Sequence, residues 1–154
     1  MRRRLAVVLT AAILAACAKK EPPPAPPPPE PPPAPAPINL ASVAGDWDFK
    51  VMPATGDSVL TTYTMTATAD TSGWKVMLPN RKPMTPHVMT MGDSVMVSMD
   101  PYESVLRKGQ KVSTNSVFHL VGDKLMGTTV AHYTTKSADS VVTLRGEGTR
   151  KAPK

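Results

Sequence analysis

The stretch V-A-G-D-W-D-F-K-V, residues 43–51, alternates two kinds of side chain with a period of two. The first set is apolar or small: Val43, Gly45, Trp47, Phe49 and Val51. The second set is mostly charged: Ala44, Asp46, Asp48 and Lys50. Because successive side chains of a β-strand point to opposite faces, the stretch predicts a strand with one face in a core and the other in water.

The same period continues along the chain. In S-V-L-T-T-Y-T-M-T-A-T, residues 58–68, one side carries Val59, Thr61, Tyr63, Met65 and Ala67, and the other side carries threonines. Segments rich in Val and Thr, which favour strands, also occupy residues 74–78, 87–91, 94–99, 112–121, 124–133 and 139–149. Eight strands and no helix of useful length are therefore expected.

Gly-Asp pairs at residues 56–57, 92–93 and 122–123 each precede a strand, and the last two fit two-residue hairpin turns. Sequential hairpins predict an all-β, antiparallel, up-and-down meander over residues 43–150. Eight strands are enough to close into a small barrel, which removes exposed edges and leaves space for one small ligand. A two-sheet β-sandwich is the alternative.

Gly45-Asp46-Trp47 in the first strand, with Arg145 and Arg150 in the last, resembles the calycin superfamily, the lipocalins and their relatives. The resemblance implies that the tryptophan packs at the closed end of a barrel beneath a late-strand arginine. It implies a shared fold and no particular ligand, because one fold serves many functions.

The charge of the chain is uneven. The formal net charge is +6, but residues 43–150 hold 11 Lys and Arg against 10 Asp and Glu. The excess positive charge lies outside that domain, on three sites: Arg2 to Arg4, Lys19 and Lys20, and the tail of residues 151–154. A nearly neutral domain lacks the electrostatic footprint of a nucleic-acid binder, so we expect no nucleic-acid partner.

Residues 1–16 read as a secretory signal peptide: three arginines, an apolar run from Leu5 to Ala16, and small residues at its end. A run of twelve residues is too short to span a bilayer, which needs about 20. Leu14-Ala15-Ala16-Cys17 resembles the lipobox of bacterial lipoproteins. The resemblance implies lipidation of Cys17 by a diacylglyceryl group and cleavage before it. The alternative is that Cys17 is a small apolar residue in an uncleaved segment.

Residues 17–42 form the predicted tether. Between Pro22 and Pro37 there are 12 prolines in 16 residues, which favours an extended, semi-rigid polyproline II spacer. A proline-rich ligand for aromatic grooves is the other interpretation. Ala18, where an aspartate would resemble an inner-membrane retention signal, favours the outer membrane, facing the periplasm.

Three groups of residues are candidates for a catalytic or metal-binding site. His87, Met89 and Met91 share one face of a predicted strand, and soft ligands suit Cu(I), although methionines also fill irregular cores. The repeated Gly-Asp-Ser at 56–58 and 92–94 is similar to the nucleophile block of GDS-type hydrolases, but the required late Asp-x-x-His is missing, which favours turn chemistry. His119 and His132 lie on neighbouring predicted strands at unequal distances from the turn between them.

The functional expectation is a membrane-anchored lipoprotein of the bacterial envelope that binds a small apolar ligand or an envelope partner. Trp47, Tyr63, Met65 and Val95 are predicted to line the barrel interior, and the connection at residues 100–112 is a candidate lid or partner surface. No enzyme activity, cofactor or metal is expected. The alternatives are a structural or assembly lipoprotein with a solid barrel, and a copper-handling lipoprotein.

Overall fold

The computed structural model describes residues 36–135 and 138–152, which contain one curled β-sheet. The predicted signal peptide, Cys17 and most of the proline-rich tether lie outside the described residues. The elements are, in chain order, α1 (Leu40–Val43), β1 (Gly45–Pro53), β2 (Thr61–Ala67), β3 (Lys75–Met77), β4 (His87–Met91), β5 (Ser94–Glu103), β6 (Lys111–Val121), β7 (Lys124–Tyr133), η1 (Ala138–Ser140) and β8 (Val141–Arg150).

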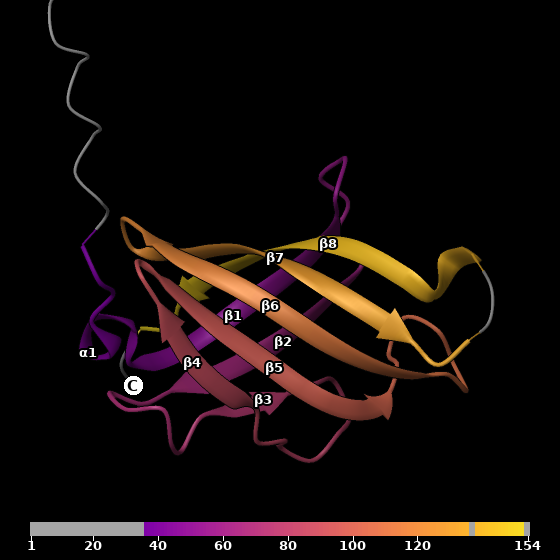
Figure 1. Cartoon of the computed structure of the whole chain (residues 1–154), viewed down its shortest axis with the longest axis horizontal. Coiled ribbons are helices and arrows are strands. Elements are labelled where there is room, and N and C mark those ends of the chain that lie inside the picture. The colour runs from indigo at the N-terminus through magenta and orange to yellow at the C-terminus, as the bar shows by residue number, and fades with distance from the viewer. Residues whose placement is uncertain (1–35, 136–137, 153–154) are drawn as a thin grey trace, which may run out of the picture. The chain divides into compact units, whose positions relative to one another are not determined.

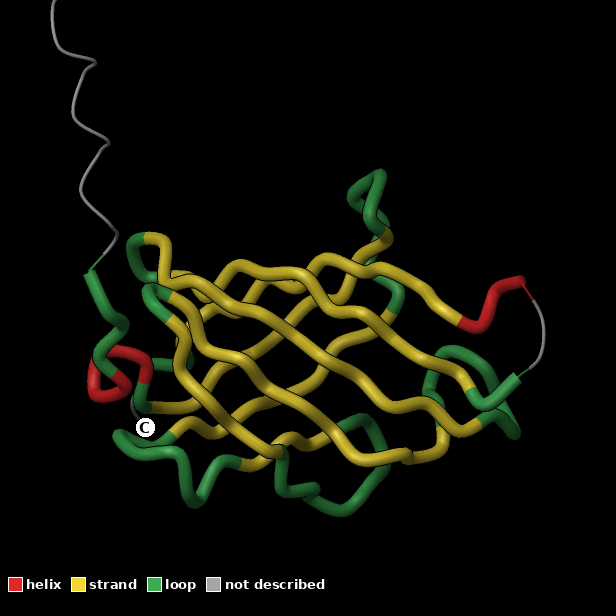
Figure 2. Tube along the Cα trace, in the orientation of Figure 1, coloured by secondary structure: helices red, strands yellow, loops and turns green. Residues whose placement is uncertain are grey.

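The eight strands form a single antiparallel sheet in the order β3-β2-β1-β8-β7-β6-β5-β4. Except for β3 and β4, strands that follow one another in the chain pair as hairpins. The curl brings the first strand against the last, so that β1 pairs with β8 (Figures 1 and 2). This confirms the predicted all-β meander of eight antiparallel strands and excludes the two-sheet sandwich. The result is a strongly curled half-barrel.

The ring of hydrogen bonds is interrupted between β3 and β4, so two edges remain where closure was expected to remove them. Val76 of β3 forms an isolated bridge with Met84, which lies in the connection before β4. The β3–β4 connection contains Pro79, Pro83 and Pro86, which have no N–H to donate to a ladder. Extension of β3 and β4 into this connection as a paired ladder would therefore lack donors at three positions.

Two hairpin turns match their prediction. Met91 pairs with Ser94, and Val121 pairs with Lys124, which leaves two-residue turns at Gly92-Asp93 and Gly122-Asp123. Gly92 has φ of 57° and Gly122 has φ of 63°, while neither aspartate has a positive φ. Glycine at the first central position with positive φ is the pattern of the type II′ turn, whose twist suits hairpins.

Two strand ends differ from the sequence expectation. β5 continues to Glu103 through an irregularity between Met99 and Tyr102, which accommodates Pro101 without a ladder hydrogen bond. The loop that follows is therefore residues 104–110, shorter than the predicted 100–112. Val59 lies before β2 and is 49% exposed, because β2 begins only at Thr61.

Candidate ligand-binding site

The interior of the half-barrel has a packed end, at the side of α1. Trp47 is fully buried there, and its Nε1 donates a hydrogen bond of 2.9 Å to the carbonyl of Val43. The guanidinium of Arg150 lies 4.3 Å from the centre of the Trp47 ring. Arg150 also donates to the carbonyls of Ser42, at 2.6 Å, and Ala44. A tryptophan beneath a last-strand arginine is the contact that the calycin resemblance implies.

Gly45 makes this arrangement possible. Its φ of 131° is a conformation that residues with a side chain rarely adopt. A Cβ atom there would lie 2.8 Å from Nη1 of Arg150. The absence of a side chain at Gly45 therefore leaves room for Arg150, which covers Trp47.

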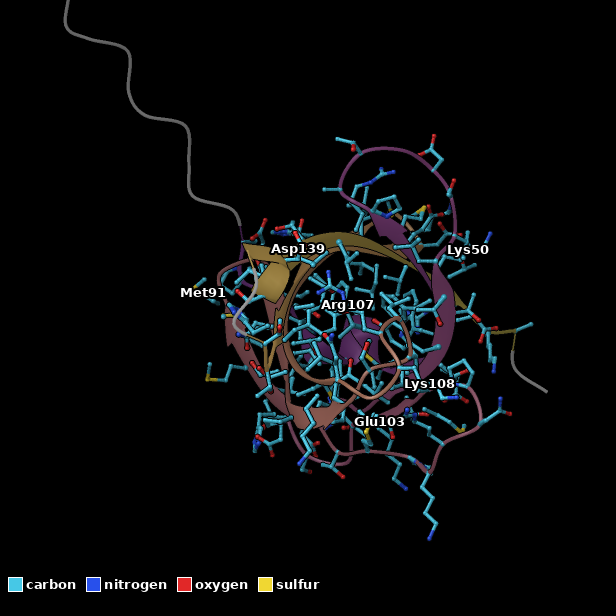
Figure 3. The ribbon with its side chains drawn as sticks, turned by 90° about the vertical axis from the view of Figure 1, so that its right-hand side faces the viewer. Lys50, Met91, Glu103, Arg107, Lys108 and Asp139 are labelled. Atoms are coloured by element: carbon cyan, nitrogen blue, oxygen red, sulfur yellow. The ribbon has the colours of Figure 1, made fainter. Side chains whose placement is uncertain are left out.

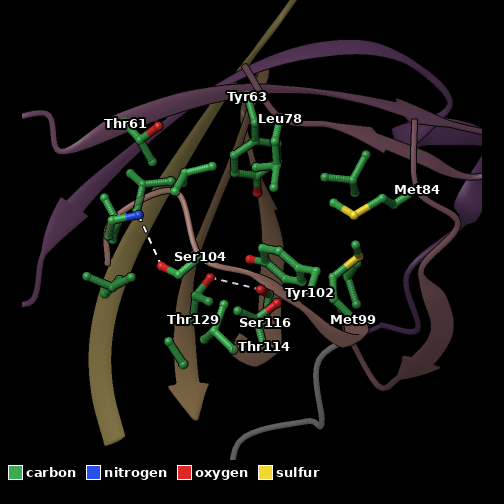
Figure 4. A pocket seen from close by; sticks show the side chains of 18 of the residues that line it. Thr61, Tyr63, Leu78, Met84, Met99, Tyr102, Ser104, Thr114, Ser116 and Thr129 are labelled. Carbon is green, nitrogen blue, oxygen red and sulfur yellow. Dashed lines mark hydrogen bonds between the residues drawn. The ribbon is translucent and has the colours of Figure 1, made fainter. Parts of the chain in front are cut away.

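The other half of the interior contains a cavity (Figure 4). The space in which a water-sized sphere can be centred is about 70 Å³. The apolar side chains of its wall come from seven strands and two loops. They are Val51, Met65, Val76, Leu78, Met84, Val97, Met99, Val105, Leu106, Val112, Phe118, Ala131 and Leu144. The wall contains no charged side chain, so the cavity favours an uncharged, mostly apolar occupant.

Hydroxyl groups supply the polar part of the wall. The three tyrosines of the chain, Tyr63, Tyr102 and Tyr133, all line the cavity. The hydroxyls of Ser116 and Thr129 bond to each other across β6 and β7 at 2.8 Å. The Tyr63 hydroxyl points into the cavity toward Tyr102 (Figure 4). An occupant with one hydrogen-bonding group would find a partner in these hydroxyls.

Burial shifts the acidity of two of these tyrosines. Removal from water raises the pKa of Tyr63 strongly, and the neighbouring Tyr102 adds to the shift. Burial likewise raises the pKa of Tyr102, with Thr114 opposing the shift through a hydrogen bond. Both phenols therefore stay neutral well above physiological pH, and the cavity presents hydrogen-bonding groups without charge.

The free energy of unfolding should consequently decrease at alkaline pH because of Tyr63. The unfolded phenol ionises near its usual value of 10, whereas the folded phenol resists ionisation, so its contribution is complete below about pH 10 and is lost as pH rises further. The expected loss is about 1.4 kcal/mol per pH unit for this one group. Urea unfolding at about pH 9 and pH 11 should show a smaller loss for Tyr63→Phe than for the unmodified chain. Equal losses of stability in Tyr63→Phe and the unmodified chain would contradict this prediction.

The loop of residues 104–110 closes the cavity at the end away from α1 (Figure 3). Ser104 is 4% exposed, and its Oγ accepts hydrogen bonds from the backbone N–H groups of Leu106, at 3.1 Å, and Arg107, at 3.0 Å. Arg107 lies 4.2 Å from the centre of the Tyr133 ring and donates to the carbonyl of Asp139 at 2.8 Å. These contacts hold the loop over this end of the cavity, and its role as a lid or a partner surface stays a prediction.

The four residues predicted to line the interior divide between the two ends. Tyr63 and Met65 line the cavity. Trp47 and Val95, at 0% and 1% exposure, are packed into the core and are not part of the cavity wall. Whether any of them contacts a ligand stays a prediction. The sequence did not single out Met99, Tyr102 or Leu106, which line the cavity. Tyr102 and Leu106 were covered only by the candidate connection at residues 100–112.

The Gly-Asp-Ser at residues 92–94 lies beside a histidine, but the geometry is not that of a catalytic relay. Nδ1 of His119 is 3.3 Å from Ser94 Oγ and 3.5 Å from Asp93 Oδ1, and Ser94 Oγ is 3.0 Å from the same Asp93 oxygen. In a relay the histidine uses one nitrogen for the serine and the other for the acid. Here both partners share Nδ1, which supports the turn interpretation.

His119 and His132 do not pair, since their cross-strand partners are Met126 and Ser113. In the described part of the chain, no three His, Cys, Asp or Glu side chains are grouped closely enough to hold a metal ion.

Residues 36–135 and 138–152 include no helix that is long and apolar enough to cross a membrane.

Comparison with family models, with curated proteins and with solved structures found no match to this chain.

Proposed function

We propose that this protein is a lipid-anchored lipoprotein of the bacterial envelope whose half-barrel binds a small, slim apolar molecule. The observation that carries the binding proposal is the uncharged cavity, whose mostly apolar wall includes the hydroxyl of Tyr63. Sequence alone supports the anchor, through the signal-like residues 1–16 and the lipobox ending at Cys17. The Trp47–Arg150 contact supports a relationship to the calycins.

The size of the cavity limits the ligand. An apolar cavity of about 150 Å³ is sufficient for benzene, and the present space of about 70 Å³ is half of that. A benzene-sized ring is therefore too large, and an unbranched chain longer than a few carbons places only its terminal carbons in this space and leaves the rest in the entrance beside the loop of residues 104–110. We therefore favour a linear amphiphile with an uncharged hydroxyl or carbonyl head, which can exchange a hydrogen bond with Tyr63 or Tyr102.

Entry of such a molecule requires the loop of residues 104–110 to move. Val105 and Leu106 are each 36% exposed although they form part of the cavity wall, so they stand between the cavity and solvent. The ligand would pass beside Leu106, at the end of the sheet where Arg107 and Lys108 are labelled in Figure 3. The cover is only a short loop, whose displacement leaves the strands in place.

Titration of the full chain with decan-1-ol and with decanoate, followed by methyl NMR, tests the binding site. Decan-1-ol should shift the methyl resonances of Met65, Met84 and Met99, which line the cavity, and leave the indole N–H of Trp47 unmoved. Decanoate should bind more weakly, because its charge would lose water without gaining an ion pair. Unmoved cavity methyls would reject the site and favour a structural or assembly role exerted through the surface.

A cavity-filling substitution tests whether this half of the interior is hollow. Ala131, which is 2% exposed and lines the cavity, should accept Ala131→Leu with little loss of stability and with loss of decan-1-ol binding. The matched control is Ala67→Leu, because Ala67 is 4% exposed in the packed cluster around Trp47. That overpacking should cost about 1–3 kcal/mol in urea unfolding. Similar costs for both variants would contradict a hollow interior.

A further inference from the structure

Three methionines share the outer face of the β4–β5 hairpin. On β4, Val88 is 8% exposed and faces the core. Met89 and Met91, one and three residues farther along the strand, are 58% and 62% exposed. On β5, Met96 lies between Val95 and Val97, which are buried, so its side chain leaves the sheet on the outer face.

The register brings these side chains together. Met89 is directly opposite Met96 in the antiparallel ladder, and Met91 is two residues farther along β4 on the same face. Directly opposite Cβ atoms lie about 4.5–5.5 Å apart, and diagonal neighbours lie about 7–8 Å apart. A methionine side chain has three rotatable bonds, so three sulfur atoms can meet above such a triangle. The Gly92-Asp93 turn fixes the register.

The surroundings favour a soft ligand set. His87, the nearest possible nitrogen ligand on β4, has its Nε2 3.2 Å from Asp100 Oδ2. On β6, Nδ1 of His119 lies 3.3 Å from Ser94 Oγ and 3.5 Å from Asp93 Oδ1, so one of its two ring nitrogens is already engaged. The residue beside Met96 on β6 is Val117. Hard cations prefer oxygen ligands, while thioethers select Cu(I).

We propose that Met89, Met91 and Met96 form a trigonal site for Cu(I) on the outer face of the half-barrel. The site is separate from the cavity, since Met65, Met84 and Met99 belong to the cavity wall and these three do not. Occupation of the site requires only that Cu(I) binds, without electron transfer. Cu(I) loading and decan-1-ol binding should therefore be independent.

The test is competition between the full chain and the coloured chelator bicinchoninate for Cu(I), under reducing, oxygen-free conditions. We expect the chain to withdraw one Cu(I). Met96→Leu should weaken the affinity at least tenfold, because it removes one of three ligands while keeping an apolar side chain of similar size. The matched control is Met77→Leu on β3, since Met77 is also exposed, at 47%, but lies on the opposite edge of the sheet.

A second readout uses Ag(I), which has the same charge and softness as Cu(I) and no redox chemistry under these conditions. It should shift the methyl resonances of Met89, Met91 and Met96, and leave those of Met84 and Met99 in place. Failure to withdraw Cu(I), an equal loss in Met77→Leu, or undiminished binding after all three methionines are changed to leucine would overturn the proposal. Circular dichroism confirms that each variant is folded.

Discussion

Trp47→Ala should unfold the domain or bring it close to unfolding at room temperature. Removing a buried aromatic side chain costs about 3–5 kcal/mol, and small domains have only about 5–15 kcal/mol in total. Trp47 has no exposed surface, and its ring also supports the guanidinium of Arg150. Urea unfolding monitored by circular dichroism should show the loss as a lower midpoint. A loss below about 1 kcal/mol would mean that this end relaxes to fill the space.

Two further variants separate the contributions at this site. Trp47→Phe retains an aromatic ring but leaves the buried carbonyl of Val43 without its donor, so it should cost about 1–3 kcal/mol. Met77→Ala, at an exposed position on β3, should change stability by no more than about 0.5 kcal/mol. If Trp47→Phe proved as harmful as Trp47→Ala, the hydrogen bond, and not the burial of the ring, would hold this end together.

Gly127→Ala is expected to have an effect of similar size, for a different reason. A Cβ atom on Gly127 would lie 2.0 Å from the carbonyl oxygen of Val117 and 2.6 Å from Cδ1 of Phe118. The nearest of these atoms belongs to the backbone of the paired strand β6, so no side-chain rotation can relieve the clash. We expect a cost of about 3 kcal/mol or more, at the upper end of what overpacking produces.

Gly146→Ala is the matched control, because Gly146 also faces Phe118 but from β8. Its added Cβ would be 3.1 Å from the ring atom Cε1, a contact that a small tilt of the ring relieves. Its midpoint in urea should therefore shift much less than that of Gly127→Ala. Equal midpoints for the two variants would show that β6 and β7 separate easily, contrary to the close approach in this structure.

Sequence alone was sufficient for the strands and for their faces. Alternation identified Trp47, Phe49 and Val51 as buried residues of β1, although it missed Met52. The G-x-W resemblance paired Trp47 with a late arginine, and the structure places Arg150 over its ring. Gly-Asp pairs located both tight turns. These features are local, since a period of two and a turn are determined by neighbouring residues.

The sequence does not predict where along the interior each inward-facing side chain lies. Alternation shows that Trp47 and Tyr63 both point inward, but it does not show that one is in the packed end and the other in the cavity. That difference depends on strand register, which relates residues far apart in the chain. The same limit hid the neighbour of Met89, because Met96 joins it only through the β4–β5 ladder.

The described chain enters and leaves the domain at one pole. Ile38 donates to the carbonyl of Gly92 at 2.8 Å just before α1, and the N–H of Lys151 donates to the carbonyl of Asp46 at 2.8 Å just after β8. Both attachments lie at the end of the sheet where α1 is, whereas residues 104–110 are at the opposite end (Figure 1). Mechanical tension applied through residues 38 and 151 is thus delivered to the α1 end and away from the loop that covers the cavity.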